Sequence, residues 1–255
     1  MANMHTAKVV LITGAARRIG AAMATHFHRQ GYALIIHYHR SAAEALTLQQ
    51  TLNAARADSA HLLQADLGDS TQIAALAASA LAWRGHIDVL VNNASRFYPT
   101  PLGQVTRECW DDLLDSNLRG GFFLAQALAP TLRQRRGCII NLSDFHADGG
   151  LKEYPVYSIA KAGVSMLTKA LARELAPQVR VNGIAPGAIL WPEHEASTQD
   201  SATLQKKLHG IALGRMGAPQ DIAAAALFLV EQASYMTGQT IHVDGGRSID
   251  NSLLS

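Results

Sequence analysis

Short apolar runs alternate with longer stretches of helix-forming residues along the whole chain. Most of the runs are apolar at consecutive positions, a pattern that is typical of parallel strands buried on both faces. The seven runs are Lys8–Thr13, Ala33–Tyr38, His61–Ala65, Ile87–Asn93, Gly137–Ser143, Val179–Pro186 and Gln239–Asp244. Helix-length stretches connect them, so the pattern predicts an α/β fold: a doubly wound, seven-stranded parallel sheet with helices on both faces.

Local signals indicate where several helices begin and end. Asp69 and Gln72 have the spacing of a capping box, Pro219 fits the first turn of a helix, and Gly31 fits the position just after one. No linker rich in Pro, Gly or Ser divides the chain, so we expect a single domain over residues 1–255. In doubly wound sheets, ligands bind beyond the carboxyl ends of the strands. The residues that follow the apolar runs are therefore the functional candidates.

The composition argues against several classes of function. The chain is 48% hydrophobic and 16% charged, and its formal net charge of +2 is too small to indicate nucleic-acid binding. Cys109 and Cys138 have no Cys/His cluster around them, which argues against zinc and fits a reducing compartment. We find no signal-peptide pattern and no apolar run near the ~20 residues of a membrane span. We expect a soluble cytoplasmic protein that binds no metal, nucleic acid or membrane.

A glycine-containing turn, TGAARRIG (Thr13–Gly20), follows the first run. Gly14 permits a tight turn, and Gly20 lets the next helix pack closely on the sheet. The free N–H groups at the start of that helix would then point at an anion, such as a dinucleotide phosphate. An ordinary structural turn is the alternative interpretation.

The second run ends in His39, Arg40 and Ser41. A fold that prefers NAD usually places an acidic residue there to bind the ribose diol. A guanidinium and a hydroxyl would instead bind a 2′-phosphate, and Arg17 is expected nearby, so the sequence predicts NADPH. Asp66, after the third run, is suited to accept from the adenine amino group. The turn at 92–95 is suited to line the cofactor groove, although both features also fit simple turn chemistry.

Tyr157 and Lys161 lie four residues apart, on one face of an expected helix. A free phenol has a pKa near 10, and an ammonium one turn away, beside a nicotinamide cation, would stabilise its phenolate. Asp144 directly follows the fifth run. We expect burial beside the phenol to raise the pKa of Asp144 and make it an acid near neutrality. The alternative is that Asp144 caps the segment Phe145–Gly150.

Four segments, TGAARRIG, NNAS, YSIAK and NGIAPGAI, together resemble the short-chain dehydrogenase/reductase family over essentially the whole chain. The resemblance implies a Rossmann fold and usually a homotetramer. It also implies that Tyr157 is the acid/base, that Lys161 orients the ribose and that Asn117 supports the lysine through water. The residues expected to bind the cofactor are Gly14, Arg17, Arg18, Ile19, Gly20, His39, Arg40, Ser41, Asp66, Leu67, Asn93, Ala94, Ser95, Lys161, Pro186 and Gly187.

Two departures from the common family pattern are similar to the pteridine reductase branch: Arg18 replaces the middle glycine, and Asp144 replaces a serine. The segments His37–Ala45 and Asn92–Leu102 are also similar to that branch. This resemblance implies that Phe97 stacks on a pterin ring, that Ser95 contacts the ligand or a cofactor phosphate, and that Arg18 reaches both the pyrophosphate and the pterin carbonyl. Core packing is the alternative for Phe97. The expected substrate residues are Arg18, Ser95, Phe97, Asp144, Tyr157, Leu190 and Trp191.

A substrate lid is expected at about 188–210, where Leu190, Trp191 and Pro192 would wall the pocket. Glu193 and His194 fit a surface loop better than a metal or acid/base site. The stretch WPEH (Trp191–His194) also resembles bacterial dihydromonapterin reductases.

The leading hypothesis is an NADPH-dependent reductase of dihydropterins, with dihydrofolate or oxidised pterins as further substrates. A general carbonyl or 3-oxoacyl thioester reductase is the alternative, and a serine at position 144 would serve that reaction better than Asp144. A non-catalytic NADPH sensor is a third hypothesis. It would not need the proton-transfer residues Tyr157, Lys161 and Asn117.

Overall fold

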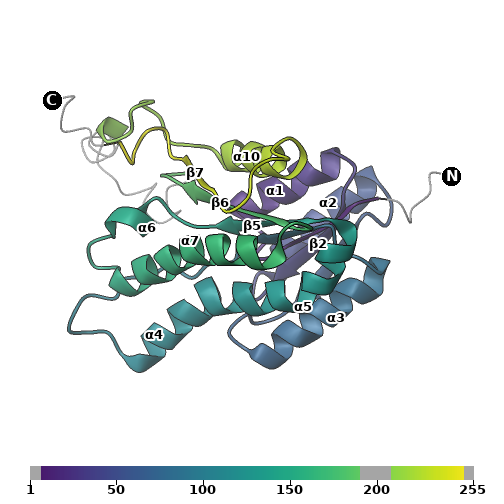
Figure 1. Ribbon diagram of the computed structural model, residues 1–255, viewed down its shortest axis with the longest axis horizontal. Coiled ribbons are helices and arrows are strands. Elements are labelled where there is room, and N and C mark those ends of the chain that lie inside the picture. Colours follow the sequence, from purple (N-terminus) through teal and green to yellow (C-terminus); the bar gives the residue numbers. More distant parts are fainter. Residues whose placement is uncertain (1–6, 190–207, 250–255) are drawn as a thin grey trace.

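The computed structural model describes residues 7–189 and 208–249. One parallel sheet runs through it in the strand order β3-β2-β1-β4-β5-β6-β7 (Figure 1). The strands are β1 Val9–Ile12, β2 Ala33–Tyr38, β3 Ala60–Gln64, β4 Val89–Asn92, β5 Cys138–Leu142, β6 Arg180–Pro186 and β7 Thr240–Val243. The helices are α1 Arg18–Arg29, α2 Ala42–Ala55, α3 Ser70–Arg84, α4 Arg107–Leu114, the π-helix η1 Asp115–Arg119, α5 Gly120–Arg135, α6 His146–Gly149, α7 Pro155–Leu175 and α10 Pro219–Glu231.

Helices cover both faces of the sheet, as the consecutive apolar positions predicted (Figure 1). One face packs against α3, α5 and α7, and the other packs against α1, α2 and α10. Strand β1 shows the alternation: Val9 and Leu11 belong to the first layer of core, whereas Val10 and Ile12 belong to the second. Because every strand pair is parallel, this two-sided burial confirms the predicted doubly wound fold.

The observed strands fall within one or two residues of the predicted runs. Gly31 follows α1 with a φ of +89°, and Pro219 begins α10, both as predicted. Asp69 caps α3 by accepting from the N–H groups of Thr71 and Gln72. The capping box is not reciprocal, because the Gln72 side-chain oxygen accepts from the backbone N–H of Asp66, 2.8 Å away.

Polar side chains and backbone groups join the carboxyl ends of β1 and β4 at the centre of the sheet. The Thr13 hydroxyl accepts from the backbone N–H groups of Asn93 and Ala94, at 2.9 and 3.0 Å. The Asn93 side chain donates in return to the carbonyls of Thr13 and Gly14, at 2.8 and 3.0 Å. The strand order reverses at β1, so these bonds fix the edge of the sheet where a doubly wound fold binds its ligand.

Candidate active site

The glycine turn after β1 leaves no room for side chains at two positions. Gly14 has a φ of +61°, and a Cβ atom there would lie 2.9 Å from the Ala94 Cα atom. A Cβ atom on Gly20 would lie 2.3 Å from the Gly14 carbonyl oxygen, because the turn folds back on the start of α1. Glycine at both positions therefore lets the turn pack tightly against the end of β4 and the start of α1. Both glycines also line the cleft described below.

A buried histidine holds the same turn in place. His37, on β2, accepts from the Gly14 N–H through Nδ1 (3.1 Å), and its Nε2–H donates to the Ala65 carbonyl (3.1 Å). Burial lowers the pKa of His37 to about 4, so the ring is neutral at pH 7 and has one donor and one acceptor, as these bonds require. His37 therefore connects three strand ends, a role that sequence analysis missed.

Arg18 occupies the position where the family usually has its middle glycine, and its φ of +51° lies in the left-handed region. A non-glycine residue is destabilised there by about 1 kcal/mol. The preceding residue, Arg17, forms no side-chain cap bond, and the first turn of α1 has no acidic residue. The start of α1 thus presents unpaired N–H groups and two guanidinium side chains, which suit an anionic ligand.

A cleft of about 860 Å³ opens in front of the glycine turn. That volume is in the usual range for a small-molecule site. Most of the predicted cofactor residues line it, namely Gly14, Arg17, Arg18, Ile19, Gly20, His39, Arg40, Ser41, Asp66, Leu67, Asn93, Ala94 and Ser95. The other three, Lys161, Pro186 and Gly187, are not among the lining residues, and their cofactor roles stay predictions.

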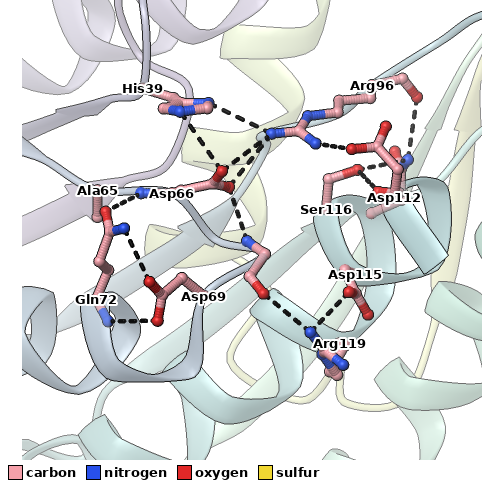
Figure 2. A network of polar contacts seen from close by, with 12 residues as sticks. His39, Ala65, Asp66, Asp69, Gln72, Arg96, Asp112, Asp115, Ser116 and Arg119 are labelled. Carbon is pink, nitrogen blue, oxygen red and sulfur yellow. Dashed lines mark hydrogen bonds and ion pairs between the residues drawn. The ribbon is translucent and has the colours of Figure 1, made fainter. Parts of the chain in front are cut away.

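An ion-pair network crosses one side of the cleft (Figure 2). Asp66 lies 3.5 Å from the His39 ring nitrogen and 3.3 Å from the Arg96 guanidinium, which also forms an ion pair with Asp112 on α4. Burial alone would raise the pKa of Asp66, but a hydrogen bond from the Gly68 N–H, followed by the charges of His39 and Arg96, holds it below the usual value. Sequence analysis missed Arg96 and Asp112.

The proposed acid–base residues lie on the loop after β5, which carries Asp144, and on α7, which carries Tyr157 and Lys161. The Tyr157 hydroxyl donates to Asp144 Oδ2 at 2.7 Å, and Lys161 Nζ donates to the Leu142 carbonyl at 2.9 Å. Tyr157 is only 5% exposed. Burial and the negative charge of Asp144 raise the pKa of Tyr157 well above 10, whereas burial lowers the pKa of Lys161 to about 8.

The second oxygen of Asp144 is also occupied. Oδ1 accepts from the backbone N–H of His146 at 2.8 Å and lies 2.9 Å from Nδ1 of the His146 ring. Burial alone would raise the pKa of Asp144, but the hydrogen bonds from His146 and Tyr157 outweigh it, so the pKa lies below its usual value. The expectation of a raised pKa was wrong, because the run of residues does not reveal that His146 turns back onto the carboxylate. The bond from the His146 N–H is a local turn contact, and the N-cap residue of α6 is Phe145, which makes no side-chain cap bond.

Phe97 forms an exposed aromatic surface between the cleft and Tyr157. Its ring is 54% exposed and stacks on Tyr154, with centroids 4.5 Å apart and planes 9° apart. It also meets the Tyr157 ring edge-on at 4.8 Å. This exposure argues against core packing and leaves a flat face open to a planar ligand. Sequence analysis missed Tyr154, which lies three residues before Tyr157 and stacks on Phe97.

Asn117 lies in η1 and fixes the loop that carries Ser95. The Ser95 hydroxyl donates to Asn117 Oδ1 at 2.5 Å, and Asn117 Nδ2 donates to the carbonyls of Arg96 and Leu113 at 3.0 and 2.9 Å. A π-helix inserts an extra residue in a helix and is frequent at functional sites. The predicted support of Lys161 by Asn117 through water remains a prediction.

The predicted pocket wall of Leu190, Trp191 and Pro192, and the Glu193–His194 pair, lie outside the described residues. Within residues 7–189 and 208–249, no group of three or more His, Cys, Asp or Glu residues is arranged to hold a metal ion. No helix in those same ranges has both the length and the apolar character needed to cross a bilayer.

The doubly wound sheet carries a glycine turn, a helix start suited to bind an anion, and a Tyr–Lys pair. Together these features define a nucleotide-dependent oxidoreductase. The family model described as Enoyl-(Acyl carrier protein) reductase matches residues 14–248. The chain belongs to the short-chain dehydrogenase/reductase family, whose fold and chemistry imply a nicotinamide cofactor. The cleft of about 860 Å³, lined by the glycine turn and by Arg17, Arg18 and Arg40, fits such a dinucleotide.

Individual relatives differ in their reactions. The chain is 36% identical to Pteridine reductase 1 of Leishmania tarentolae, over 98% of this chain and 99% of the relative. It is 38% identical to 3-oxoacyl-(acyl-carrier-protein) reductase FabG of Staphylococcus aureus (strain Mu50), over 95% of this chain and 99% of the relative. It is 38% identical to the probable galactose dehydrogenase GalD of Rhizobium meliloti, over 93% of each. These identities are too similar to choose a substrate, so the site residues must do so.

Proposed function

We propose that this protein is an NADPH-dependent pteridine reductase that reduces a ring C=N bond of a dihydropterin such as dihydrobiopterin or dihydromonapterin. Dihydrofolate and oxidised pterins are further candidate substrates. The observation that carries the proposal is the hydrogen bond between Tyr157 and Asp144, next to the open face of Phe97. A pterin presents amino and ring N–H donors, which a carboxylate accepts, whereas a ketone presents only an acceptor.

Each side chain has a distinct part in this reaction. When bound, NADPH supplies a hydride to the ring carbon. Tyr157 donates a proton to the adjacent ring nitrogen, and the Lys161 ammonium, present below about pH 8, stabilises the resulting phenolate. Asp144 orients the Tyr157 hydroxyl and the donors of the ring, and Phe97 stacks on the flat face of the ring. Leu190 and Trp191 remain proposed substrate contacts.

We propose NADPH rather than NADH because the end of β2 presents His39, Arg40 and Ser41 to the cleft. A hydrogen bond to a charged group contributes about 1.5–3 kcal/mol, so these side chains should favour the 2′-phosphate by at least about tenfold in kcat/KM. Comparable kcat/KM with the two cofactors would refute this assignment. The variant Arg40→Ala should lower kcat/KM for NADPH and so narrow the difference between the two cofactors. The kcat/KM for NADH should not change and serves as an internal control.

A 3-oxoacyl thioester reductase is the second candidate function, favoured by the 38% identity to FabG. The deciding experiment follows NADPH oxidation with dihydrobiopterin, dihydromonapterin, dihydrofolate, biopterin and acetoacetyl thioester as substrates. We expect turnover of the dihydropterins. Turnover of the thioester alone would refute the pterin assignment, and tight NADPH binding with no turnover would favour the non-catalytic sensor.

We also propose that the protein is a cytoplasmic homotetramer, as the family resemblance implies. Large apolar side chains on α4, α5 and α7 are exposed, which supports burial against a second copy of the chain. They are Trp110, Phe122, Phe123, Ile159 and Met166. Sedimentation velocity tests the assembly: a tetramer is expected, and a monomer at micromolar concentration would contradict it.

A further inference from the structure

The turn after β1 contains a glycine that does not fix its own conformation. Gly14 has a φ of +61°, in a region that glycine adopts freely and other residues rarely adopt. Contacts from neighbouring elements must therefore hold the turn in the one conformation observed. Because the turn lines the cleft, these contacts decide how well the cleft is preorganised for a ligand.

Both peptide groups that flank Gly14 are fully hydrogen-bonded. From the side of β4, the Asn93 amide donates to the carbonyls of Thr13 and Gly14, at 2.8 and 3.0 Å. From the side of β2, His37 accepts from the Gly14 N–H through Nδ1 at 3.1 Å. The backbone carbonyl of His37 accepts from the Ala15 N–H at 2.9 Å. The turn is thus fixed between the ends of two strands.

The ring of His37 is itself held in one orientation. A backbone N–H only donates, so Nδ1 carries no hydrogen, and Nε2–H then donates to the Ala65 carbonyl at 3.1 Å. His37 is only 1% exposed, so both bonds lie away from solvent. The residue lies at the wall of the cleft but is too buried to be a main ligand contact, so it acts through the backbone that it holds.

The two bonds of the ring differ in what depends on them. The segment at Ala65 is also held by the sheet, because the Ala65 N–H donates to the Tyr38 carbonyl at 3.1 Å, directly after the β2–β3 pairing. Gly14 lies beyond the end of β1, and its N–H bonds to a side chain instead of to a strand. Loss of Nδ1 would leave this donor unpaired and free the peptide group to rotate.

We propose that His37 is a positioning residue of the cofactor site, whose Nδ1 atom holds the glycine turn in the conformation that binds the ADP half of the nicotinamide dinucleotide. The turn shares its cleft with residues 39–41 and Asp66, which are expected to bind the 2′-phosphate and the adenine. A turn that is already fixed in the free protein loses less conformational freedom on binding, which raises affinity. The proposal rests on the cofactor part of the proposed function and does not depend on which substrate is reduced.

Two substitutions separate the two bonds of the ring. In His37→Asn the amide oxygen is attached to Cγ, as Nδ1 is, so it keeps an acceptor for the Gly14 N–H, but the side chain is too short to reach the Ala65 carbonyl. In His37→Gln the longer side chain reaches the Ala65 carbonyl and has no acceptor at the level of Nδ1. His37→Asn also removes more volume from a buried position, so it should melt at the lower temperature of the two.

Cofactor affinity should follow the opposite order. Calorimetry measures the binding of NADPH and of 2′,5′-ADP, which lacks the nicotinamide half. His37→Gln should bind both at least about fivefold more weakly, the factor that corresponds to one ordinary hydrogen bond. His37→Asn should bind both as the parent does. His37→Met, which is similar in volume to histidine and has no hydrogen-bonding group, is a second variant and should match His37→Gln in cofactor affinity.

Hydrogen exchange tests the bond to Gly14 in the absence of cofactor. The fragment 13–20 should exchange faster in His37→Gln than in the parent or in His37→Asn, and the fragment 138–142 on β5 should not change. His28→Gln is the matched control, since His28 is also buried and its Nε2 lies 2.7 Å from the Ser59 hydroxyl, near the far end of α1. This control should lower the melting temperature and leave both NADPH affinity and exchange at 13–20 unchanged.

Three results would overturn the role of His37: parental affinity in His37→Gln, an equal loss in His37→Asn, or losses that follow the order of the melting temperatures. A parent that binds NADH in preference to NADPH would instead refute the choice of cofactor. The comparison is then made with NADH and 5′-AMP, and parental affinity in His37→Gln would still overturn the positioning role.

Discussion

Replacing Lys161 by methionine should stabilise the protein while abolishing its activity. Lys161 is 3% exposed, and burial lowers its pKa from 10.5 to about 8. Since one pKa unit corresponds to about 1.4 kcal/mol, the charged form destabilises the folded state by about 3 kcal/mol. Methionine has a similar length and no charge. It forfeits the hydrogen bond to the Leu142 carbonyl, so the net gain should be about 1–2 kcal/mol.

The gain should depend on pH in a defined direction. Below about pH 8 the lysine is charged in both the folded and the unfolded chain, and the full penalty is present. Between about pH 8 and 10.5 the folded protein releases this proton while the unfolded chain keeps it. The unfolded state then binds more protons, so the parent gains stability as the pH rises. The advantage of Lys161→Met over the parent should shrink across this window.

Urea unfolding of the cofactor-free protein tests both statements. The parent and Lys161→Met are compared at about pH 7 and about pH 10, at one protein concentration, because any subunit assembly contributes to stability. Lys169→Met, an exposed position on the same helix, is the control and should change the free energy of unfolding by less than about 0.5 kcal/mol. The reasoning is refuted if Lys161→Met is the less stable protein at neutral pH, or if its advantage is independent of pH.

Three further substitutions test other parts of the site. Gly20→Ala would place a Cβ atom 2.3 Å from the Gly14 carbonyl oxygen, so it should destabilise the protein by about 1–3 kcal/mol. Calorimetry should show at least tenfold weaker NADPH binding, and an unchanged Kd would count against a cofactor site at the turn. Phe97→Ala should raise KM for a dihydropterin about two- to tenfold, the effect of one aromatic pair, and equal KM values would exclude stacking. Arg96→Ala breaks the ion pairs to Asp66 and Asp112 and should lower the free energy of unfolding by up to about 1 kcal/mol. The loss should be smaller at high salt, which screens ion pairs. A loss that does not depend on salt would show that Arg96 acts through packing instead.

The fold was predictable because its strands are buried on both faces. Ile139 and Ile140 on β5 pack against opposite helix layers, and that requirement produces consecutive apolar residues in the sequence. The ends of the strands likewise predict where the site lies. His39 and Ser95 follow different strands, and both line one cleft because parallel strands share an edge.

The missed residues act through contacts that periodicity does not encode. Arg96 meets Asp66 across 30 positions of chain, and His37 meets Gly14 across 23. His146 is two residues from Asp144, but only the turn of the backbone aims its ring at the carboxylate. That turn also reversed the expected direction of the pKa of Asp144. Sequence patterns locate side chains along a strand, and tertiary structure decides which polar atoms meet.

The most direct test of the pterin assignment is the ratio of kcat/KM for dihydrobiopterin to that for acetoacetyl thioester, measured in the parent and in Asp144→Ser with NADPH. Asp144 accepts from Tyr157 and is the acceptor proposed for the pterin donors. We predict that the parent prefers the pterin, and that Asp144→Ser loses pterin reduction while it binds NADPH as tightly as before. Unchanged pterin turnover in Asp144→Ser, or a parent that reduces only the thioester, would contradict the account.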